Sequence, residues 1–293
     1  MIIENQNYLE CRNHKTTQYN VLNLSGTTGQ MVAVHIGGKV LIDDLLSVKF
    51  RENNTKITAI EDRLYDAIGT LYNIRKSTST DSSVEISARD ILKIAFNIKK
   101  PTIKQVILLE NAVYKFSTTQ IIIDVNEQLK YKKNKQKLEL LEDLDLKKGR
   151  VYQKFMLYSE VGYRKNDSTS LTIKVLKEPL LYQYSRVFNQ FRNYPLKFIN
   201  NQIRMSENTI ALESYILKRI SLSEKLGTKI LWKTLCKECE FEFHHKEQKR
   251  RIKKYLIDEL DFLKTNGAIY NYSINYNKDS SINYIEFEEI KDF

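Results

Sequence analysis

The segment from His244 to Thr265 constrains the fold of this chain more than any other, because it combines a helical apolar period with a basic face. Its apolar residues recur at three- and four-residue steps, which places them on one side of a helix: Ile252, Leu256, Leu260 and Leu263. Six of the twelve residues from Phe243 to Lys254 are basic, whereas only Glu247 is acidic. Four basic residues cluster opposite the apolar side, with Lys249 nearer the edge: Lys246, Arg250, Lys253 and Lys254. Such a helix, taken alone, is either a solvated charged face or a surface that binds a polyanion such as DNA.

The length and charge of the chain narrow the class of protein. A chain of 293 residues suggests two domains, and the net charge of +11 favours a polyanionic partner or an anionic membrane surface. No run of apolar residues reaches the roughly 18 that a membrane-spanning helix needs. The first residues, MIIENQNYLECRNH, lack the basic and then apolar layout of a signal peptide. We therefore expect a cytoplasmic protein that does not enter a membrane.

The three cysteines, Cys11, Cys236 and Cys239, are too few and too odd in number for a disulfide framework. Cys236 and Cys239 form a C-x-x-C motif that His244 and His245 follow, a combination that suggests zinc. The loop from Cys239 to His244 is, however, far shorter than the usual spacing between two pairs of zinc ligands. We therefore favour cysteines that fill apolar space on a short helix, and we expect neither a metal ion nor another cofactor.

Three helices are predicted in the first half of the chain. The first follows a capping box between Thr58 and Glu61, and its apolar residues are in helical phase: Ile60, Leu64, Ile68 and Leu71. The Ser/Thr-rich linker STSTDSS, residues 77–83, leads to a short helix at about residues 87–96. Pro101 then occupies the first position of a third helix, where its missing N–H costs nothing. The apolar side of the third helix is predicted to comprise Ile103, Val106, Ile107, Leu109 and Val113, and the β-like sequence KFSTTQIIIDV follows.

This order of helix, short helix, helix and strands is typical of a winged helix, a variant of the helix-turn-helix motif. The recognition helix would begin near Pro101, and the residues predicted to bind DNA at its exposed N-terminal turn are Lys99, Lys100, Thr102, Lys104 and Gln105. The alternative is an ordinary three-helix core with a polar cap. The highly charged residues 128–150 are predicted to form either a helix or a mobile loop. Strand-like segments follow at 151–158 and 171–175.

The second half of the chain repeats this plan. Ser206 precedes a helix, Thr228 starts a short helix that ends near Cys239, and the basic helix follows and ends at Asn266–Gly267. Two segments in which apolar and polar residues alternate then flank a turn at residues 277–281, and this pattern predicts a wing hairpin. We therefore predict an α+β fold with two tandem winged-helix (helix-turn-helix) domains and small antiparallel wings. The predicted division is an N-terminal extension with short strands at 1–56, a first winged-helix domain at 57–178 and a second at 179–293.

The sequence of the second half resembles a known family. The segment FHHKEQKRRIKKYLIDELDFLKTNGAIYNYSINY, closing on INYIEFEEI, is similar to the second winged-helix domain of plasmid replication initiators of the iteron-binding type. The upstream segment EPLLYQYSRVFNQFRNYPLKFINNQIRMSENTIALESYILKRI is similar to that family's linker and first helix, which carries an aromatic residue near its middle, here Tyr215. The resemblance covers residues 57–290 and is strongest from residue 178 onward. Many members have a proline and an alanine where this chain has Lys253–Lys254–Tyr255, and residues 1–50 have no counterpart.

The resemblance implies a function and a set of partners. Members of this family bind directly repeated sites in a plasmid origin through both winged helices, help to open adjacent AT-rich DNA and recruit host replication proteins. Their dimers act at inverted repeats as autorepressors, and they contain no nuclease or ATPase centre. The resemblance therefore implies a non-enzymatic initiator of plasmid DNA replication that binds double-stranded DNA and can form a homodimer. Together with the basic face, it predicts the DNA-binding residues of the second domain: Lys246, Lys249, Arg250, Arg251, Lys253 and Lys254.

Three other functions stay open at this point. A transcriptional regulator, or a DNA-binding protein of a phage or mobile element, would need the same groove-binding surface as an initiator. A rolling-circle initiator would nick DNA with a His–hydrophobic–His metal pair and a nucleophilic tyrosine. His244 and His245 are adjacent, so in an extended strand they would point in opposite directions and could not chelate one ion together. A protein-interaction scaffold is the third alternative.

Overall fold

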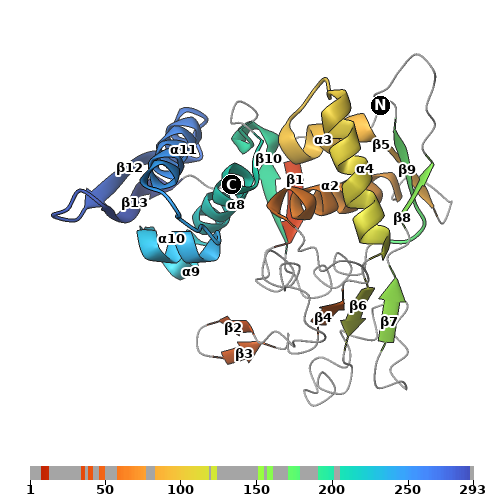
Figure 1. Cartoon of the computed structure of the whole chain (residues 1–293), viewed down its shortest axis with the longest axis horizontal. Coiled ribbons are helices and arrows are strands. Elements are labelled where there is room, and N and C mark those ends of the chain that lie inside the picture. The colour runs from red at the N-terminus through yellow and green to blue at the C-terminus, as the bar shows by residue number, and fades with distance from the viewer. Residues whose placement is uncertain are drawn as a thin grey trace. The chain divides into compact units, whose positions relative to one another are not determined.

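The computed structural model describes residues 8–12, 34–36, 39–41, 46–49, 58–76, 83–118, 120–123, 151–154, 157–160, 171–178, 191–200 and 205–290 (Figure 1). The chain divides into two compact units, and short pieces near the N-terminus are shared between them. The first unit comprises Met1–Gln6 and Glu10–Arg192, and the second comprises Asn7–Leu9 and Asn193–Phe293. Helices and small antiparallel sheets occur in both units, as an α+β fold requires.

The described helices of the first unit are α2 (Ala59–Lys76), α3 (Ala88–Phe96) and α4 (Ile103–Thr118). The predicted capping box is confirmed: Thr58 N donates to Glu61 Oε2 at 2.8 Å, and Glu61 N donates to Thr58 Oγ1 at 3.2 Å. Helix α3 begins after Ser87, whose hydroxyl oxygen accepts from Asp90 N at 3.2 Å. These side chains satisfy backbone N–H groups that have no partner within the first turn of a helix.

The start and the apolar side of α4 differ from the prediction. The helix begins at Ile103, and Thr102 is its N-cap, so Pro101 lies before the cap rather than at the first helical position. Ile103 and Ile107, which were expected on the apolar side, are 50% and 47% exposed. The buried side comprises the predicted Val106, Leu109 and Val113, together with Ala112 and Phe116. The sequence IKQVILL is apolar on two faces at its start, so helical periodicity did not select the correct one.

One three-stranded sheet of the first unit accompanies these helices. Its strands are β5 (Val84–Ser87), β8 (Leu157–Glu160) and β9 (Thr172–Val175), and their order is β5–β9–β8. Ile86 of β5 lies opposite Ile173 of β9, and both side chains are fully buried. No strand was predicted at β5, because four residues are too few to show an alternating pattern.

Shorter sheets complete the first unit. Strands β4 (Leu46–Lys49), β6 (Gln120–Ile123) and β7 (Val151–Lys154) pair in the order β4–β6–β7, and β2 (Val34–Ile36) pairs with β3 (Lys39–Leu41). Strand β4 lies in the predicted extension but pairs with β6 of the predicted first domain. The predicted strand-like segment 151–158 consists of β7 and the beginning of β8, which belong to different sheets. The charged residues 128–150 lie outside the described residues.

The second unit contains the elements η2 (Leu196–Phe198), α8 (Glu207–Ser221), α9 (Ser223–Leu226), β11 (Lys229–Leu231), α10 (Trp232–Glu238), α11 (Lys246–Thr265), β12 (Ile269–Tyr276) and β13 (Ile282–Ile290). The strand order of its sheet is β11–β13–β12. Ser206 caps α8, as predicted, because its hydroxyl oxygen accepts from Thr209 N at 3.4 Å. Thr228, however, does not start a helix: β11 begins one residue later, and α10 begins at Trp232. A further two-stranded sheet joins β1 (Tyr8–Arg12) and β10 (Phe191–Pro195).

The two units repeat one topology. Each has a helix, a short strand, a short helix, a longer helix and two further strands, and in each the last strand lies in the centre of the sheet. The pairing is equivalent as well, because buried Ile86–Ile173 in the first sheet corresponds to buried Ile230–Ile285 in the second. The preceding pairs, Glu85–Lys174 and Lys229–Glu286, join opposite charges with the signs exchanged. The predicted order of helix, short helix and longer helix is therefore present twice, with a short strand added. In the first unit, however, β6, the strand predicted directly after α4, pairs with β4 and β7 in a separate sheet.

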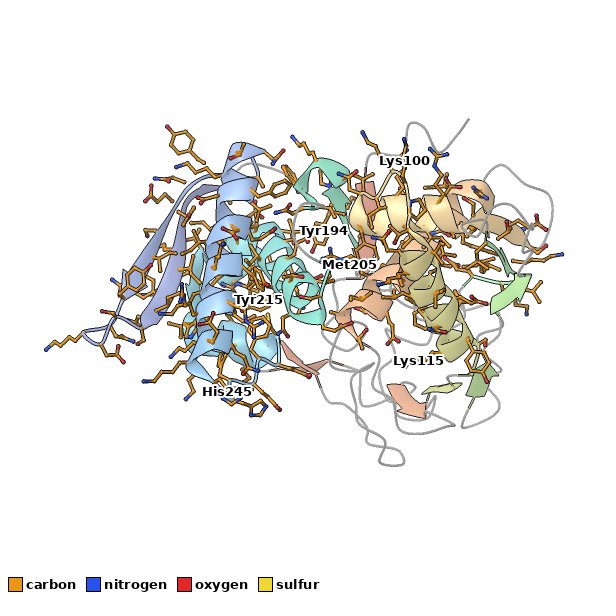
Figure 2. The ribbon with its side chains drawn as sticks, turned by 45° about the horizontal axis from the view of Figure 1, so that its top comes forward. Lys100, Lys115, Tyr194, Met205, Tyr215 and His245 are labelled. Carbon is orange, nitrogen blue, oxygen red and sulfur yellow. The ribbon has the colours of Figure 1, made fainter. Side chains whose placement is uncertain are left out.

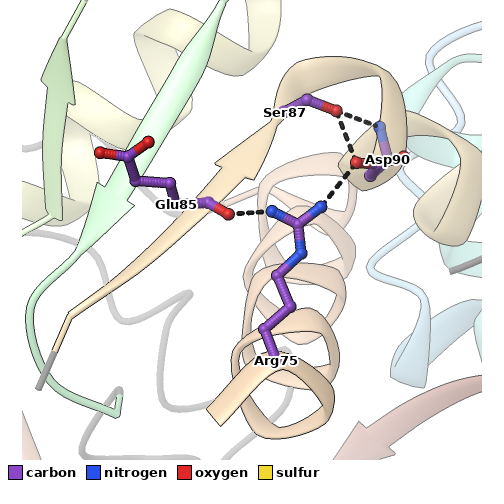
Figure 3. A network of polar contacts seen from close by, with 4 residues as sticks. All are labelled: Arg75, Glu85, Ser87 and Asp90. Atoms are coloured by element: carbon purple, nitrogen blue, oxygen red, sulfur yellow. Dashed lines mark hydrogen bonds and ion pairs between the residues drawn. The ribbon is translucent and has the colours of Figure 1, made fainter. Parts of the chain in front are cut away.

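An arginine near the end of the first helix fixes the short strand in both units. In Figure 3 the guanidinium of Arg75, from α2, donates to the backbone carbonyl of Glu85 in β5 and to Asp90 Oδ2, the latter at 2.8 Å. Arg219 of α8 donates through one nitrogen to the carbonyl of Lys229 in β11 at 3.0 Å, and to two carbonyls that precede it. Both arginines reach a carbonyl ten residues further along the chain. This shared contact supports a common plan for the two units.

Candidate nucleic-acid interface

Helix α11 separates its apolar and basic residues as predicted. Its buried side comprises Ile252, Leu256, Glu259, Leu260 and Leu263. Four of the six predicted DNA-binding residues of this helix are exposed on the other side: Lys246, Arg250, Arg251 and Lys254. Lys249 and Lys253 are half-buried and lie at the edge, so the exposed group contains Arg251 in place of the predicted Lys253. We call these four exposed residues the basic face of α11.

Few contacts restrain the basic face. Arg250 Nη1 lies 3.8 Å from Glu247 Oε2, and the two side chains are 82% and 63% exposed. An ion pair of this length between exposed groups contributes little, because water and salt screen it. The guanidinium of Arg250 can therefore exchange this carboxylate for a stronger hydrogen-bond acceptor without a large loss.

The turn between α10 and α11 is held by side chains at its two ends. Gln248 Oε1 accepts from the backbone nitrogens of His244 and His245, at 2.8 and 3.2 Å, and so completes the N-terminal turn of α11. Phe243, within this connection, stacks on Trp232, the first residue of α10, and the ring centroids are 6.4 Å apart. Figure 2 shows His245 at the beginning of α11. The direction of the basic face relative to α10 is thereby fixed.

The hairpin of β12 and β13 contacts α11 in both halves of the helix. At the N-terminal half, Lys253 Nζ donates to the carbonyl of Ser280 in the hairpin turn at 3.3 Å. At the C-terminal half, Tyr272 OH donates to Asp261 Oδ1 at 2.6 Å, and burial together with this hydrogen bond raises the pKa of the Tyr272 phenol. Lys253 therefore has a structural role that the sequence did not indicate: it positions the hairpin beside the basic face.

The hairpin turn is itself ordered by Asp279. Its Oδ1 accepts from the backbone nitrogen of Ser281 at 3.0 Å and from the hydroxyl of Ser281 at 2.6 Å. These hydrogen bonds stabilise the carboxylate and lower the pKa of Asp279 below its ordinary value. Lys278 is exposed beside it at the end of the hairpin. The hairpin thus presents a cation at its end, on a turn of defined conformation.

Cys236 and Cys239 lie at the end of the short helix α10, the first half-buried and the second buried. Cys239 is 4% exposed, and its Sγ lies 3.7 Å from the carbonyl oxygen of Ala211 in α8. Burial raises the pKa of the Cys236 thiol to about 11 and also raises that of Cys239. Among the residues that the structure describes, no three His, Cys, Asp or Glu side chains come together as a metal site would require.

The predicted DNA-binding residues of the first unit surround the start of α4. Lys99, Lys100 and Lys104 are exposed, and Figure 2 shows Lys100 at the turn before the helix. Thr102 and Gln105 instead bind each other: Thr102 N donates to Gln105 Oε1 at 2.8 Å, and Gln105 N donates to Thr102 Oγ1 at 3.4 Å. These two residues therefore cap the helix, while their contact with DNA stays a prediction.

Helices α4 and α11 begin in the same way. In each, a glutamine at the third helical position, Gln105 or Gln248, accepts from the backbone nitrogen of the N-cap residue. With the caps aligned, Leu109 corresponds to Ile252 and Val113 to Leu256, and all four are buried. The exposed residues at the first, fifth and ninth positions differ between the two helices. In α4 they are Ile103, Ile107 and Asn111, and in α11 they are Lys246, Arg250 and Lys254. The two helices therefore share a cap and a buried side but differ in the chemistry of their exposed side.

Comparison with known proteins finds a similar fold but no similar sequence. No family model matches the sequence, and no curated protein matches it significantly. A solved structure of domains 2 and 3 of RctB superposes with a TM-score of 0.52, at 12% sequence identity, over 94% of this chain and 98% of that one. The chain is similar in fold to domains 2 and 3 of RctB. Because the match extends over nearly the whole chain, it includes both repeats of the topology. Within the described part of the chain, no helix combines the length and the apolar character needed to cross a membrane.

Proposed function

We propose that this chain is a DNA replication initiator that binds double-stranded DNA through two winged-helix repeats. In this proposal α4 and α11 are the recognition helices, and β12 with β13 forms the wing of the second repeat. Similarity in fold to RctB, a replication initiator, supports the assignment. The chain would act by binding DNA and other replication proteins, without a catalytic centre of its own.

The basic face of α11 carries the proposal. Lys246, Arg250, Arg251 and Lys254 are exposed together on one side of a helix whose other side is buried in its own unit. A winged helix inserts such a helix in the major groove, where arginine can donate two hydrogen bonds to guanine and lysine can neutralise phosphates. Each neutralised phosphate releases condensed counterions, so binding would weaken steeply as the salt concentration rises.

The hairpin contacts support the same geometry. Lys253 contacts the hairpin turn and Asp279 orders its backbone, so the exposed Lys278 is carried by a turn that lies beside α11. A wing in this position would follow the DNA backbone next to the groove that α11 occupies, and its lysine would contact phosphate rather than bases. The helix would then supply sequence specificity, and the wing would supply orientation.

The origin-specific part of the proposal extends beyond the fold. We propose that the binding sites are direct repeats in an origin, that the replicon is a plasmid, and that host replication proteins bind the assembled complex. Binding of a homodimer at an inverted repeat would provide autorepression. These proposals rest on the resemblance of the second half to the iteron-binding initiators of plasmids.

Footprinting of the full chain on the DNA that flanks its own gene tests the proposal. We expect protection of several direct repeats of about 20 base pairs, the length that two recognition helices one helical turn apart would span, beside an AT-rich tract. Protection should decrease as salt rises. Absence of protection, or binding that salt does not change, would contradict the proposal. Protection of a single inverted repeat alone would indicate a regulator, and metal-dependent cleavage of the same DNA would indicate a nicking enzyme.

A further inference from the structure

Helix α4 exposes apolar side chains at positions where α11 exposes cations. Ile103 and Ile107 are the first and fifth residues of α4, and they are 50% and 47% exposed. Lys246 and Arg250 occupy the equivalent positions of α11. Two half-exposed isoleucines one turn apart form an apolar strip, and such a strip costs free energy while it faces water.

The charge around the apolar strip indicates what covers it. Residues 97–109 contain three charged side chains, all of them cations: Lys99, Lys100 and Lys104. The first acidic residue of α4 is Glu110, which is half-buried and lies one turn beyond Ile107. All three lysines are exposed at the same end of the helix as the two isoleucines. A surface that combines apolar side chains with clustered cations complements a polyanion that also has apolar groups. The major groove of DNA has this composition, since phosphates line its edges and the C5-methyl group of thymine projects into it.

We propose that α4 recognises thymine methyl groups through Ile103 and Ile107, with Lys99, Lys100 and Lys104 on the flanking phosphates. The proposal rests on the proposed function, because it takes α4 as a recognition helix, and it adds the base that this helix selects. The two repeats would then recognise different parts of the DNA site through different kinds of contact. Helix α11 would bind guanine edges and phosphates through charge-assisted hydrogen bonds, whereas α4 would select the A·T-rich part of the site by apolar contact.

The test uses replacement of thymine by deoxyuridine, which removes the C5-methyl group and leaves base pairing intact. Random-sequence duplexes are first selected on the full chain, and the selected duplex is resynthesised with one thymine at a time replaced by deoxyuridine. Affinity of each duplex is measured for the wild-type chain and for the double variant Ile103→Ala/Ile107→Ala. Leu231→Ala is the matched control, because Leu231 is equally exposed, at 49%, but lies on β11 of the other unit.

We expect deoxyuridine at one or more thymines to weaken wild-type binding by about fourfold per methyl group. The double variant should bind the thymine duplex with reduced affinity and should no longer distinguish thymine from deoxyuridine. Leu231→Ala should keep the wild-type ratio. Because both isoleucines are half-exposed, their truncation leaves the core unchanged, which circular dichroism of the full chain verifies. Ile103→Val/Ile107→Val, which removes less apolar surface, should give an intermediate ratio.

Other outcomes would overturn the inference and are distinguishable from failure of the proposed function. If selected duplexes bind but deoxyuridine changes nothing, or if the double variant keeps the wild-type ratio, α4 does not recognise thymine methyl groups. If the double variant instead changes the sedimentation of the protein and leaves DNA affinity unchanged, the apolar strip binds a second copy of the chain. If the full chain enriches no duplex at all, the proposed function fails, and the inference fails with it.

Discussion

Replacement of Arg250 by alanine gives the most direct measure of the basic face of α11. The side chain is 82% exposed, and its 3.8 Å contact with Glu247 is screened by solvent. We therefore expect the free energy of unfolding to change by no more than about 0.5 kcal/mol. Any larger effect on DNA affinity then comes from a lost contact with DNA rather than from a damaged fold.

The size of the effect on binding depends on what Arg250 contacts. If its guanidinium donates two hydrogen bonds to a guanine, its loss costs about 1–3 kcal/mol, which is roughly 5- to 150-fold in affinity, and relaxes specificity at that base pair. If it contacts phosphate, affinity falls alike on all sequences, and the slope of log affinity against log salt decreases by about 0.9. Titration of the variant against specific and random duplexes at several salt concentrations separates the two cases.

Lysine variants away from the basic face test whether DNA affinity depends on the position of a cation or only on the total charge of the chain. Lys264→Ala removes a cation from the last turn of the same helix, where Lys264 is exposed and donates to Asn271 at 2.8 Å. Lys132→Ala and Lys133→Ala remove cations that lie outside the described residues. We expect all three controls to retain most of the specific affinity. If Arg250→Ala and these controls lost the same amount of DNA affinity, the basic face of α11 would have no special role, because binding would then depend only on total charge.

Three further predictions follow from other contacts. Lys253→Met removes the hydrogen bond to Ser280 and should accelerate hydrogen exchange in the hairpin turn and weaken binding to all duplexes alike; unchanged exchange would contradict the positioning role. Arg219→Met removes three bonds to backbone carbonyls and should lower the free energy of unfolding in urea by about 1–3 kcal/mol, whereas Arg251→Met, at an exposed position, should change it little. The pKa of Cys236 is raised to about 11 from 9.0, so the folded protein holds this proton more tightly than the unfolded chain. The contribution of Cys236 to the free energy of unfolding should therefore be constant below pH 9 and be lost as pH rises towards 11, so the fall in stability over this range should be smaller in Cys236→Ser.

The local signals in the sequence were reliable where one short segment contains all the information. The capping boxes illustrate this, because Thr58 and Glu61 bind each other within a single turn of the chain. The buried side of α11 was predicted for the same reason: Ile252, Leu256, Leu260 and Leu263 keep one helical phase over three turns, and most of the remaining positions are polar or charged. The topology predicted for the second half, with three helices and a hairpin, followed from signals of this kind.

Signals failed where the deciding contact comes from elsewhere in the chain. Strands β5 and β11 have four and three residues, so neither shows a period, and each exists because β9 or β13 pairs with it. The buried side of α4 was predicted correctly at Val106, Leu109 and Val113. Ile103 and Ile107 were assigned to it wrongly, because both faces of the first turns are apolar and the local period does not distinguish them. Strand pairing and packing with distant segments cannot be predicted from the local sequence of hydrophobic and polar residues.

The basic face shows both sources of information in one helix. Composition and helical period were enough to predict a cationic side on α11, since the charge of a lysine or arginine does not depend on its neighbours. Which cations belong to that side depended on the tertiary structure. Lys253, which was expected to contact DNA, is half-buried and donates to the carbonyl of Ser280 in the hairpin that returns 27 residues later, while its contact with DNA stays a prediction. Arg251 takes its place on the exposed side, because no described element covers that edge of the helix.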